Sequence, residues 1–252
     1  MKGMRYQFAP IQRFPAPLFV PSCLYGKIHA VIRLLIFDLD DTLVSSRCWV
    51  PAETRLFNLL GHPFEPELAV RYKGMNARDV ARAIYDYARP ADYTPEDCGR
   101  LLRAFLLESA QEGTVPRPGA NELLRAVAGK YELAVASGSP VEVIRLMLDQ
   151  FGWLPLFSLL VSSEEVERGK PAPDVFLETL QRADCAPDEA LVIEDSFFGA
   201  RAAKAAGIRC FVAPSTGDPR IPAEADRAFP TLAEMIPALA GGEEAVVDDA
   251  VK

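Results

Sequence analysis

The chain has 252 residues, of which half are hydrophobic and a quarter charged, and this is enough for one large domain or for a core with a smaller inserted domain. The net charge of −8 argues against nucleic acid as the main partner. No run approaches the roughly 18 uninterrupted apolar residues that a membrane span needs, so we expect no membrane insertion. Five widely spaced cysteines and only two histidines favour a cytoplasmic protein with reduced thiols over a disulfide framework or a His-ligated zinc enzyme.

The two ends of the chain differ from the rest in composition. Residues 1–30 contain no Asp or Glu and several prolines, which break any amphipathic helix or signal-type apolar core. We expect a disordered N-terminal extension there, or an artefact of a start codon chosen too early. Residues 241–252 resemble a short acidic tail.

Between these ends, apolar runs alternate with helical patterns. The sequence predicts strands over 31–37, 132–137, 158–163, 190–194 and 208–213. The later strands are separated by predicted helices over 119–129, 141–150, 173–183 and 198–206. Strands that alternate with helices indicate right-handed βαβ units, so the fold class is α/β, with a Rossmann-like parallel sheet flanked by helices.

A long insertion follows the first strand. Residues 48–115 predict helices throughout, over 51–60, 66–73, 77–88 and 95–111. We therefore expect an α/β core domain of residues 31–47 and 116–240, and an all-helical cap domain of residues 48–115. The insertion is either a helical elaboration without a catalytic role or a lid over the strand ends, and its place directly after an acidic motif favours the lid.

That acidic motif is the most informative feature of the chain. Asp38 and Asp40 follow the first apolar run two residues apart, so period-two alternation would point both to one side. Open α/β sheets bind ligands at the carboxyl ends of their strands. Two neighbouring carboxylates repel each other, and this repulsion is unfavourable unless a cation or a shared proton offsets it. The alternative is an ordinary acidic turn in which Thr42 or Asp41 caps a helix.

Three later segments place polar or charged side chains at the ends of predicted strands or in rigid turns. Ser137 and Gly138 follow the second strand and open a helix, where Ser139 either helps to bind an anion or caps the helix. Lys170 lies between a glycine and two prolines. Glu194 and Asp195 end another strand, with Ser196 as the expected cap of the next helix.

Four converging carboxylates would need more positive charge than one lysine supplies. Unpaired buried carboxylates cost several kcal/mol each, on the order of the penalty for any buried ion. Mg²⁺ answers this need, because it takes oxygen ligands from one or two carboxylates together with phosphate and water. Hydroxyl, lysine and backbone donors would then hold phosphate oxygens, so the site is suited to phosphoryl transfer.

The four ordered motifs resemble the haloacid dehalogenase superfamily, in particular the branch of β-phosphoglucomutase and small sugar-phosphate phosphatases. The resemblance covers about residues 31–235 and rests on 38–42, Ser137, 170–176, and 194–207. It implies that Asp38 is the nucleophile and Asp40 the general acid and base. It also implies that Ser137, Gly138 and Lys170 hold the phosphoryl group. The ligands it implies for Mg²⁺ are Asp38, the Asp40 carbonyl and Asp195, with Glu194 behind them or as an occasional direct ligand.

The resemblance favours hydrolysis of a small phosphorylated metabolite such as a sugar phosphate. Dehalogenases lack the second aspartate, and the positions that hold a His and an Arg in phosphosugar mutases hold Val50 and Ala77 here. Arg78 could substitute, so a mutase stays the alternative, and a non-catalytic binding protein on the same fold is less favoured. The insertion offers candidate substrate contacts that could equally be solvated helix faces: Arg71, Lys73, Asn76 and Arg78. We expect a monomer or a homodimer.

Overall fold

The computed structural model of the protein describes residues 31–45, 47–65, 67–68, 72 and 75–240. The N-terminal extension and the acidic tail predicted from the sequence lie outside these residues, as does most of the helix expected over 66–73. None of the helices in the described part has the length and apolar character needed to cross a membrane.

The described residues form one parallel six-stranded sheet, with the order β3-β2-β1-β4-β5-β6. Five of its strands lie where apolar runs predicted them: β1 (Leu34–Phe37), β2 (Glu132–Ser137), β3 (Leu159–Ser162), β4 (Ala190–Glu194) and β5 (Arg209–Val212). The sixth strand, β6 (Arg227–Ala228), was not predicted, because it consists of two exposed residues without an apolar run. The predicted fold class is confirmed.

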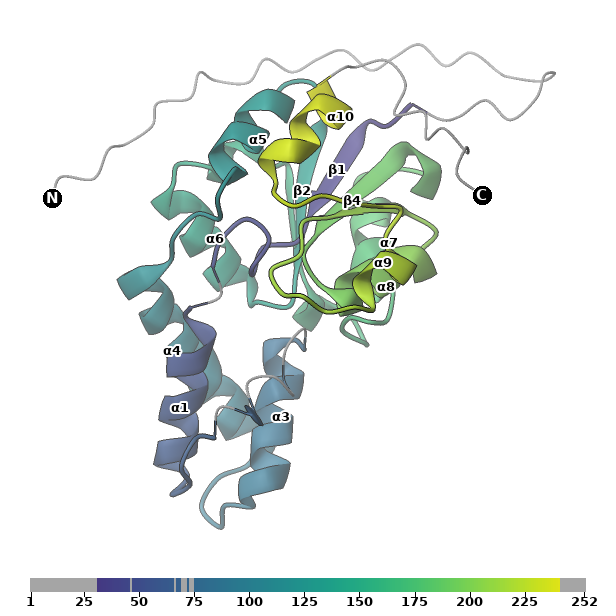
Figure 1. The fold of residues 1–252 in the computed structure, drawn as a ribbon. Coiled ribbons are helices and arrows are strands. Elements are labelled where there is room, and N and C mark those ends of the chain that lie inside the picture. Colours follow the sequence, from purple (N-terminus) through teal and green to yellow (C-terminus); the bar gives the residue numbers. More distant parts are fainter. Residues whose placement is uncertain (1–30, 46, 66, 69–71, 73–74, 241–252) are drawn as a thin grey trace, which may run out of the picture.

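Helices cover both faces of the sheet (Figure 1). Leu35 and Phe37 of β1 pack in a core with α5 (Ala120–Val127), α6 (Val141–Gln150) and α10 (Ile236–Ala240). Leu34 and Ile36 point to the other face, toward α7 (Asp174–Arg182), α8 (Phe197–Ala205) and α9 (Ile221–Glu224). β1 is thus buried on both faces, as its continuous apolar run indicated. Short 3-10 turns, η1 to η4, lie at Leu154–Leu156, Ser163–Glu165, Pro187–Glu189 and Ala233–Met235.

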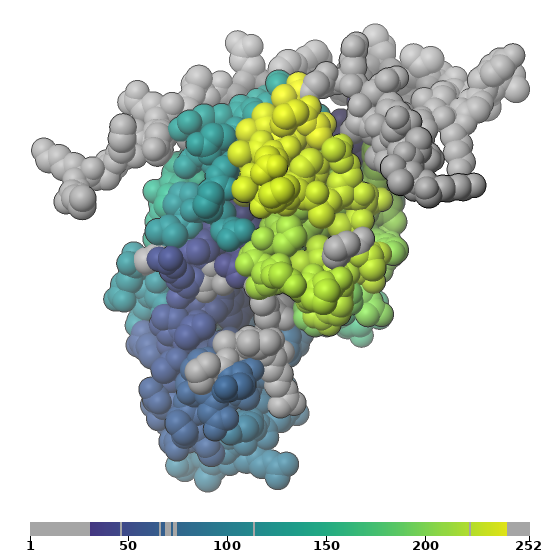
Figure 2. Space-filling view, in the orientation of Figure 1, coloured from purple at the N-terminus to yellow at the C-terminus, as the bar shows by residue number. Residues whose placement is uncertain are grey.

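Three described helices lie between β1 and α5: α1 (Trp49–Leu59), α3 (Ala77–Ala88) and α4 (Pro95–Gly113). We call the segment 48–115 the helical insert. α4 begins at a capping box in which Thr94 accepts a hydrogen bond from the amide of Asp97, and Pro95 at the first helical position adds to this start signal. α4 packs against both α1 and α3. The insert forms a lobe at one end of the molecule (Figure 2).

The insert contacts the loops that follow two strands of the sheet. The amide of Ala77 donates to the carbonyl of Gly138, just after β2. The guanidinium of Arg78 donates to the carbonyls of Val166 and Glu167, after β3, over 3.0 to 3.4 Å. The start of α3 therefore lies against the carboxyl edge of the sheet, where α/β proteins bind ligands.

Candidate active site

Asp38 is held at the end of β1 by contacts to both of its carboxylate oxygens. Its amide donates to the carbonyl of Ile193, which continues the pairing of β1 with β4. Lys170 Nζ lies 2.7 Å from Asp38 Oδ1, and Thr42 Oγ1 donates to Asp38 Oδ2 over 2.9 Å. The side chain is 9% exposed, so these contacts fix the orientation of a nearly buried carboxylate.

The carboxylate of Asp40 accepts hydrogen bonds from both the core and the insert. Ser139 Oγ donates to Oδ2 over 2.7 Å, and Ser137 Oγ over 3.2 Å. The indole N–H of Trp49, the first residue of α1, donates to Oδ1 over 3.0 Å. Burial raises the pKa of Asp40, while the bonds from Ser139 and Trp49 oppose this shift. A raised pKa suits a carboxyl group that delivers a proton.

Lys170 contacts the carboxylates at the ends of two strands, β1 and β4. Its Nζ lies 2.7 Å from Asp38 Oδ1, 2.7 Å from Glu194 Oε1 and 3.1 Å from the carbonyl of Ala136. Burial lowers the pKa of Lys170, but the charges of Asp38 and Glu194 outweigh burial and raise it. The lysine is therefore a permanent cation that neutralises part of the acidic edge.

Glu194 is oriented by the turn between β4 and α8. Its Oε2 accepts from the amides of Asp195 and Ser196 and from the Ser196 hydroxyl, all within 3.0 Å. Ser196 caps α8, as the sequence predicted, by accepting from the amide of Gly199. A Cβ on Gly199 would lie 1.6 Å from Glu194 Oε1, so only glycine leaves room for this carboxylate.

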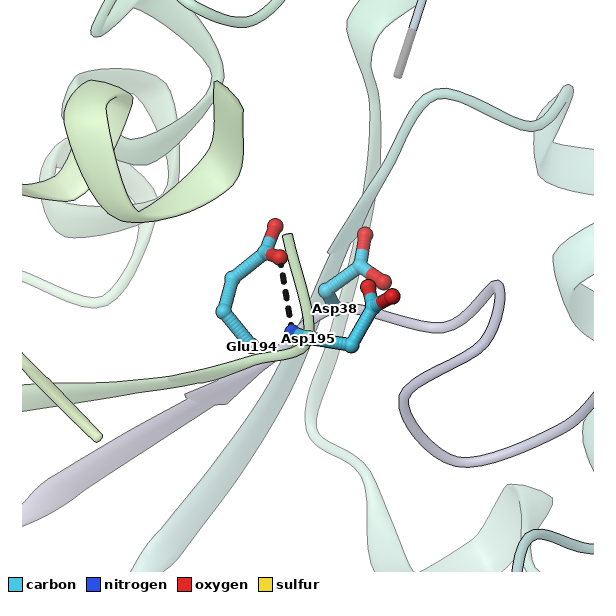
Figure 3. Close-up of side chains that lie close together, drawn as sticks. All are labelled: Asp38, Glu194 and Asp195. Carbon is cyan, nitrogen blue, oxygen red and sulfur yellow. Dashed lines mark hydrogen bonds between the residues drawn. The ribbon is translucent and has the colours of Figure 1, made fainter. Parts of the chain in front are cut away.

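Asp38, Glu194 and Asp195 form an acidic cluster whose ligand atoms lie within 4.8 Å of one another. The carboxylates of Asp38 and Asp195 lie side by side above the strand ends, and Glu194 approaches from the other side of the turn (Figure 3). Burial raises the pKa of Asp38 well above its usual value, and the charges of Glu194 and Asp195 raise it further against the opposing effect of Lys170.

These donors fit a hard divalent cation. Mg²⁺ prefers carboxylate oxygens, and a cation there would relieve the repulsion that raises the Asp38 pKa. Asp38 and Asp195 suit direct ligation. Glu194 Oε2 accepts three hydrogen bonds from the turn and Oε1 contacts Lys170, so this carboxylate is better placed to position Lys170 than to ligate an ion.

The loop after β2 does not use Ser139 as the cap of α6. Pro140 occupies the cap position and makes no side-chain cap bond, whereas the Ser139 hydroxyl donates to Asp40. Ser137 Oγ accepts from the Ser139 amide. A Cβ on Gly138 would lie 3.1 Å from the Met75 carbonyl, so the loop passes close beneath the insert. The structure thus places Ser137 and Gly138 beside Asp40 at the carboxyl edge.

Two of the four candidate contacts in the insert, Arg71 and Lys73, lie outside the described residues. Asn76 is buried, and its side chain caps α3: Oδ1 accepts from the Asp79 amide, and Nδ2 donates to Asp79 Oδ2. Arg78 is exposed and bonds to Val166 and Glu167. In this structure both side chains serve helix capping or contact between insert and core.

Three residues that shape this region were not singled out from the sequence: Trp49, Glu53 and Gly199. The indole of Trp49 reaches Asp40 because α1 begins at Trp49, beside the carboxyl edge of the sheet. Glu53 lies one helical turn further along α1 and is buried. In the sequence, Glu53 could have been noticed only as a charged residue among the apolar positions of a predicted helix. This is a weak indication of a functional residue.

The fold and the site define a class of α/β protein in which a helical insert lies over an acidic cluster at the carboxyl edge of a parallel sheet. A model of the family described as haloacid dehalogenase-like hydrolase matches residues 35–213. The chain belongs to this family, as the order of its motifs indicated.

Two characterised relatives are similar over most of the chain. Validoxylamine A 7'-phosphate phosphatase of Streptomyces hygroscopicus subsp. limoneus is 29% identical over 81% of this chain and 95% of its own length. Fructose-1-phosphate phosphatase YqaB of Escherichia coli is 30% identical over 69% of this chain and 92% of its own. The crystal structure of CbbY from Rhodobacter sphaeroides in complex with phosphate superposes with a TM-score of 0.73 at 28% identity, covering 81% of this chain and 96% of that one.

Proposed function

We propose that the protein is a Mg²⁺-dependent phosphatase that hydrolyses a small phosphorylated metabolite through an aspartyl-phosphate on Asp38. The observation that carries this proposal is the fixed carboxylate of Asp38, which is held by Lys170 and Thr42 within 4.8 Å of Asp195. A carboxylate that is oriented in this way beside a cation site is arranged for nucleophilic attack.

Asp38 attacks phosphorus, so that its bond to phosphorus forms as the bond to the leaving oxygen breaks. Asp40 gives its proton to that oxygen. It then takes a proton from the water that attacks the aspartyl-phosphate and releases inorganic phosphate. When bound by Asp38, the Asp40 carbonyl and Asp195, Mg²⁺ supplies positive charge that offsets the charge on the phosphoryl oxygens.

Lys170, Ser137 and Gly138 hold the phosphoryl group in this proposal. The lysine already touches the oxygen of the nucleophile, so it lies where a phosphoryl group on Asp38 would meet it. Ser137 and the backbone around Gly138 line the same edge next to Asp40. Donors aimed at developing charge contribute on the order of 3 kcal/mol each to transition-state stabilisation.

The proposal also divides the chain into two parts. Residues 31–47 and 116–240 form the core domain that carries the chemistry, and residues 48–115 form a cap domain that excludes water from it. Support comes from the contacts of Ala77, Arg78 and Trp49 with the carboxyl edge. Asn76 and Arg78, with Arg71 and Lys73 beyond the described residues, remain the proposed region of substrate contact.

The substrate that we propose is a sugar phosphate or a similar monoester. The two relatives named above are phosphatases of such compounds by name, and both align with most of this chain. The relatives therefore favour hydrolysis over the mutase alternative.

The test is release of phosphate from p-nitrophenyl phosphate with Mg²⁺, and its loss on chelation. Asp38→Asn should reduce the rate at least about a thousandfold, because the amide is no nucleophile. Asp149→Asn, an exposed change on α6, should match the wild type. Equal activity of Asp38→Asn and the wild type would remove Asp38 from the chemistry.

A second assay separates hydrolysis from phosphoryl transfer between hydroxyls. β-Glucose 1-phosphate is incubated with the enzyme and Mg²⁺, and the products are identified. The proposal expects free glucose and phosphate. Accumulation of glucose 6-phosphate would instead establish the mutase.

A further inference from the structure

Glu53 is a buried carboxylate that has no partner for one of its oxygens. Its residue is 3% exposed, and Oε2 has no hydrogen-bond partner among the described residues. Burying an unsatisfied charged group costs stability unless something else offsets it. A glutamate in such a position on a helix of the insert is best explained by a ligand that it meets during the reaction.

The helix geometry of α1 directs Glu53 toward the catalytic edge. Glu53 lies four residues after Trp49, slightly more than one helical turn and about 6 Å along α1 on the same face. That face is the one on which the Trp49 indole donates to Asp40. Arg55, on the opposite side of the helix, instead pairs with Glu108 and stacks over Phe105 of α4. Glu53 lies on the buried side of α1, with Ala52, Leu56 and Phe57.

Cys48, the residue directly before α1, is influenced by the charges of both Asp40 and Glu53. Burial raises the pKa of the Cys48 thiol, and the charges of Asp40, Asp41 and Glu53 raise it further. Burial also raises the pKa of Glu53 to about 7, in keeping with a carboxyl group shielded from water.

The position and the charge together restrict what can bind. In the proposed reaction Asp40 protonates the leaving oxygen, so the leaving group extends from Asp40 toward the first helix of the insert, which carries Trp49 and, one turn further, Glu53. Asp38, Asp40, Glu194 and Asp195 already outnumber Lys170, and Glu53 adds a fifth acidic group. A carboxylate in this setting accepts hydrogen bonds from hydroxyls and repels a second anion.

We propose that Glu53 recognises the leaving group by accepting hydrogen bonds from its hydroxyls, so that the enzyme selects monophosphates of neutral polyols and rejects those whose leaving group is anionic. This inference rests on the proposed phosphatase function and deepens it. Glu53 is then a specificity-determining residue, distinct from those that act on phosphorus.

The experiment compares the wild type, Glu53→Gln, Glu53→Ala and Glu112→Gln. The last variant is the matched control, because Glu112 is an exposed residue of the same insert. The substrates are p-nitrophenyl phosphate, which has no hydroxyls, a panel of neutral polyol phosphates (fructose 1-phosphate, glucose 6-phosphate and glycerol 3-phosphate), and anionic phosphoglycolate. The readout is kcat/KM for each, with circular dichroism as the check on folding.

We expect the wild type to prefer a polyol phosphate to phosphoglycolate. Both Glu53 variants should lose about tenfold to a hundredfold in kcat/KM on that polyol phosphate, the range for a hydrogen bond to a charged group. Their kcat/KM on p-nitrophenyl phosphate should stay within about twofold of the wild type. Their kcat/KM on phosphoglycolate should rise relative to their kcat/KM on the polyol phosphate. Glu112→Gln should retain the wild-type pattern.

Three results would overturn the inference while leaving the phosphatase intact: a wild-type preference for phosphoglycolate, an equal loss on all substrates in the Glu53 variants, or unchanged substrate ratios. If one of the two Glu53 variants does not fold, the inference is tested by the other variant and by the substrate preference of the wild type. Failure of the wild type to release phosphate from any substrate, p-nitrophenyl phosphate included, would instead reject the proposed function itself.

Discussion

At the scale of single residues, the hydrogen bond from Trp49 to Asp40 links the first helix of the insert to the proposed general acid. Trp49→Phe removes the donor and keeps the ring. We expect kcat/KM to fall about tenfold, because Asp40 loses part of its orientation. This bond lowers the pKa of Asp40, so its loss should raise that pKa and move the high-pH decline of activity to higher pH. A pH–rate profile measures both effects.

Trp153→Phe is the matched control for this change. Trp153 also loses an indole hydrogen bond, to Asn121, but it lies in the core away from Asp40. It should alter stability and leave the pH profile in place. If Trp49→Phe and Trp153→Phe give the same profile, Trp49 does not position Asp40.

The buried charge of Glu53 should make stability depend on pH. Its pKa is raised from 4.5 to about 7, so between these values the folded state binds more protons than the unfolded state, and stability falls as pH rises. The full penalty above pH 7 is about 3 kcal/mol. Glu53→Gln should therefore be more stable than the wild type at alkaline pH and nearly equal to it at acid pH.

Urea unfolding on both sides of this range measures the effect, with Glu112→Gln as the control that should show no such difference. If the stability gain of Glu53→Gln were the same at both ends of the range, the carboxyl group would carry no penalty for its charge. A stabilising change that weakens substrate selection would mark Glu53 as a residue kept for function.

The residues at strand ends could be predicted because parallel strands bring their carboxyl ends to one edge. This logic applied to Asp38, Ser137 and Asp195, which the structure brings to that edge. The sequence could not show which partners each group has. The pairing of Lys170 with Glu194, and the reach of Trp49 to Asp40, depend on how loops and helices fold back in three dimensions.

At the scale of elements, the turn between β4 and α8 is the most constrained part of the site. Gly199→Ala would place a methyl group 1.6 Å from Glu194 Oε1 and must displace that carboxylate, which also holds Lys170. We expect at least about a hundredfold loss of kcat and weaker Mg²⁺ binding, because small misplacements of catalytic groups cost that much. Activity titrated with Mg²⁺ checks this.

Gly99→Ala is the matched control on another helix. A Cβ at Gly99 in α4 meets nothing within 4 Å, so this change should leave activity intact and stabilise the protein by about 0.5–1 kcal/mol. Wild-type activity in Gly199→Ala would mean that Glu194 can move without consequence, which contradicts the role given to the turn.

The elements themselves were largely predictable, because long apolar or amphipathic runs determine them. Helices α3 and α6 lie at the predicted positions, and α4 extends two residues beyond its predicted end. β6 and α9 were missed since two and four residues, respectively, carry no periodic pattern. Their place is set by packing against β5 and α8.

At the scale of the whole molecule, ion pairs connect the insert to the core. Arg103 of α4 bonds to Glu142 of α6 over 2.8 and 3.0 Å and also to Glu164 of η2. Partly exposed pairs contribute about 1 kcal/mol or less. We expect Arg103→Gln to lower kcat/KM up to about fivefold by weakening the contact between insert and core, and to make kcat/KM less dependent on salt.

Arg100→Gln is the control, because Arg100 pairs with Asp97 within α4 and does not reach the core. Steady-state kinetics at low and high ionic strength compare the two variants. Indistinguishable behaviour of Arg103→Gln and Arg100→Gln would show that the ion pairs of Arg103 with the core do not contribute to activity.

The central claim is that Asp38 attacks phosphorus beside a cation held by Asp38 and Asp195. A crystal structure of the protein with Mg²⁺ and beryllofluoride, a mimic of a bound phosphoryl group, tests it most directly. The account predicts beryllium bonded to an oxygen of Asp38, fluorines in contact with Lys170 and Ser137, and Mg²⁺ on Asp38 and Asp195. Beryllofluoride bound away from Asp38, or a metal ion that avoids both aspartates, would contradict it.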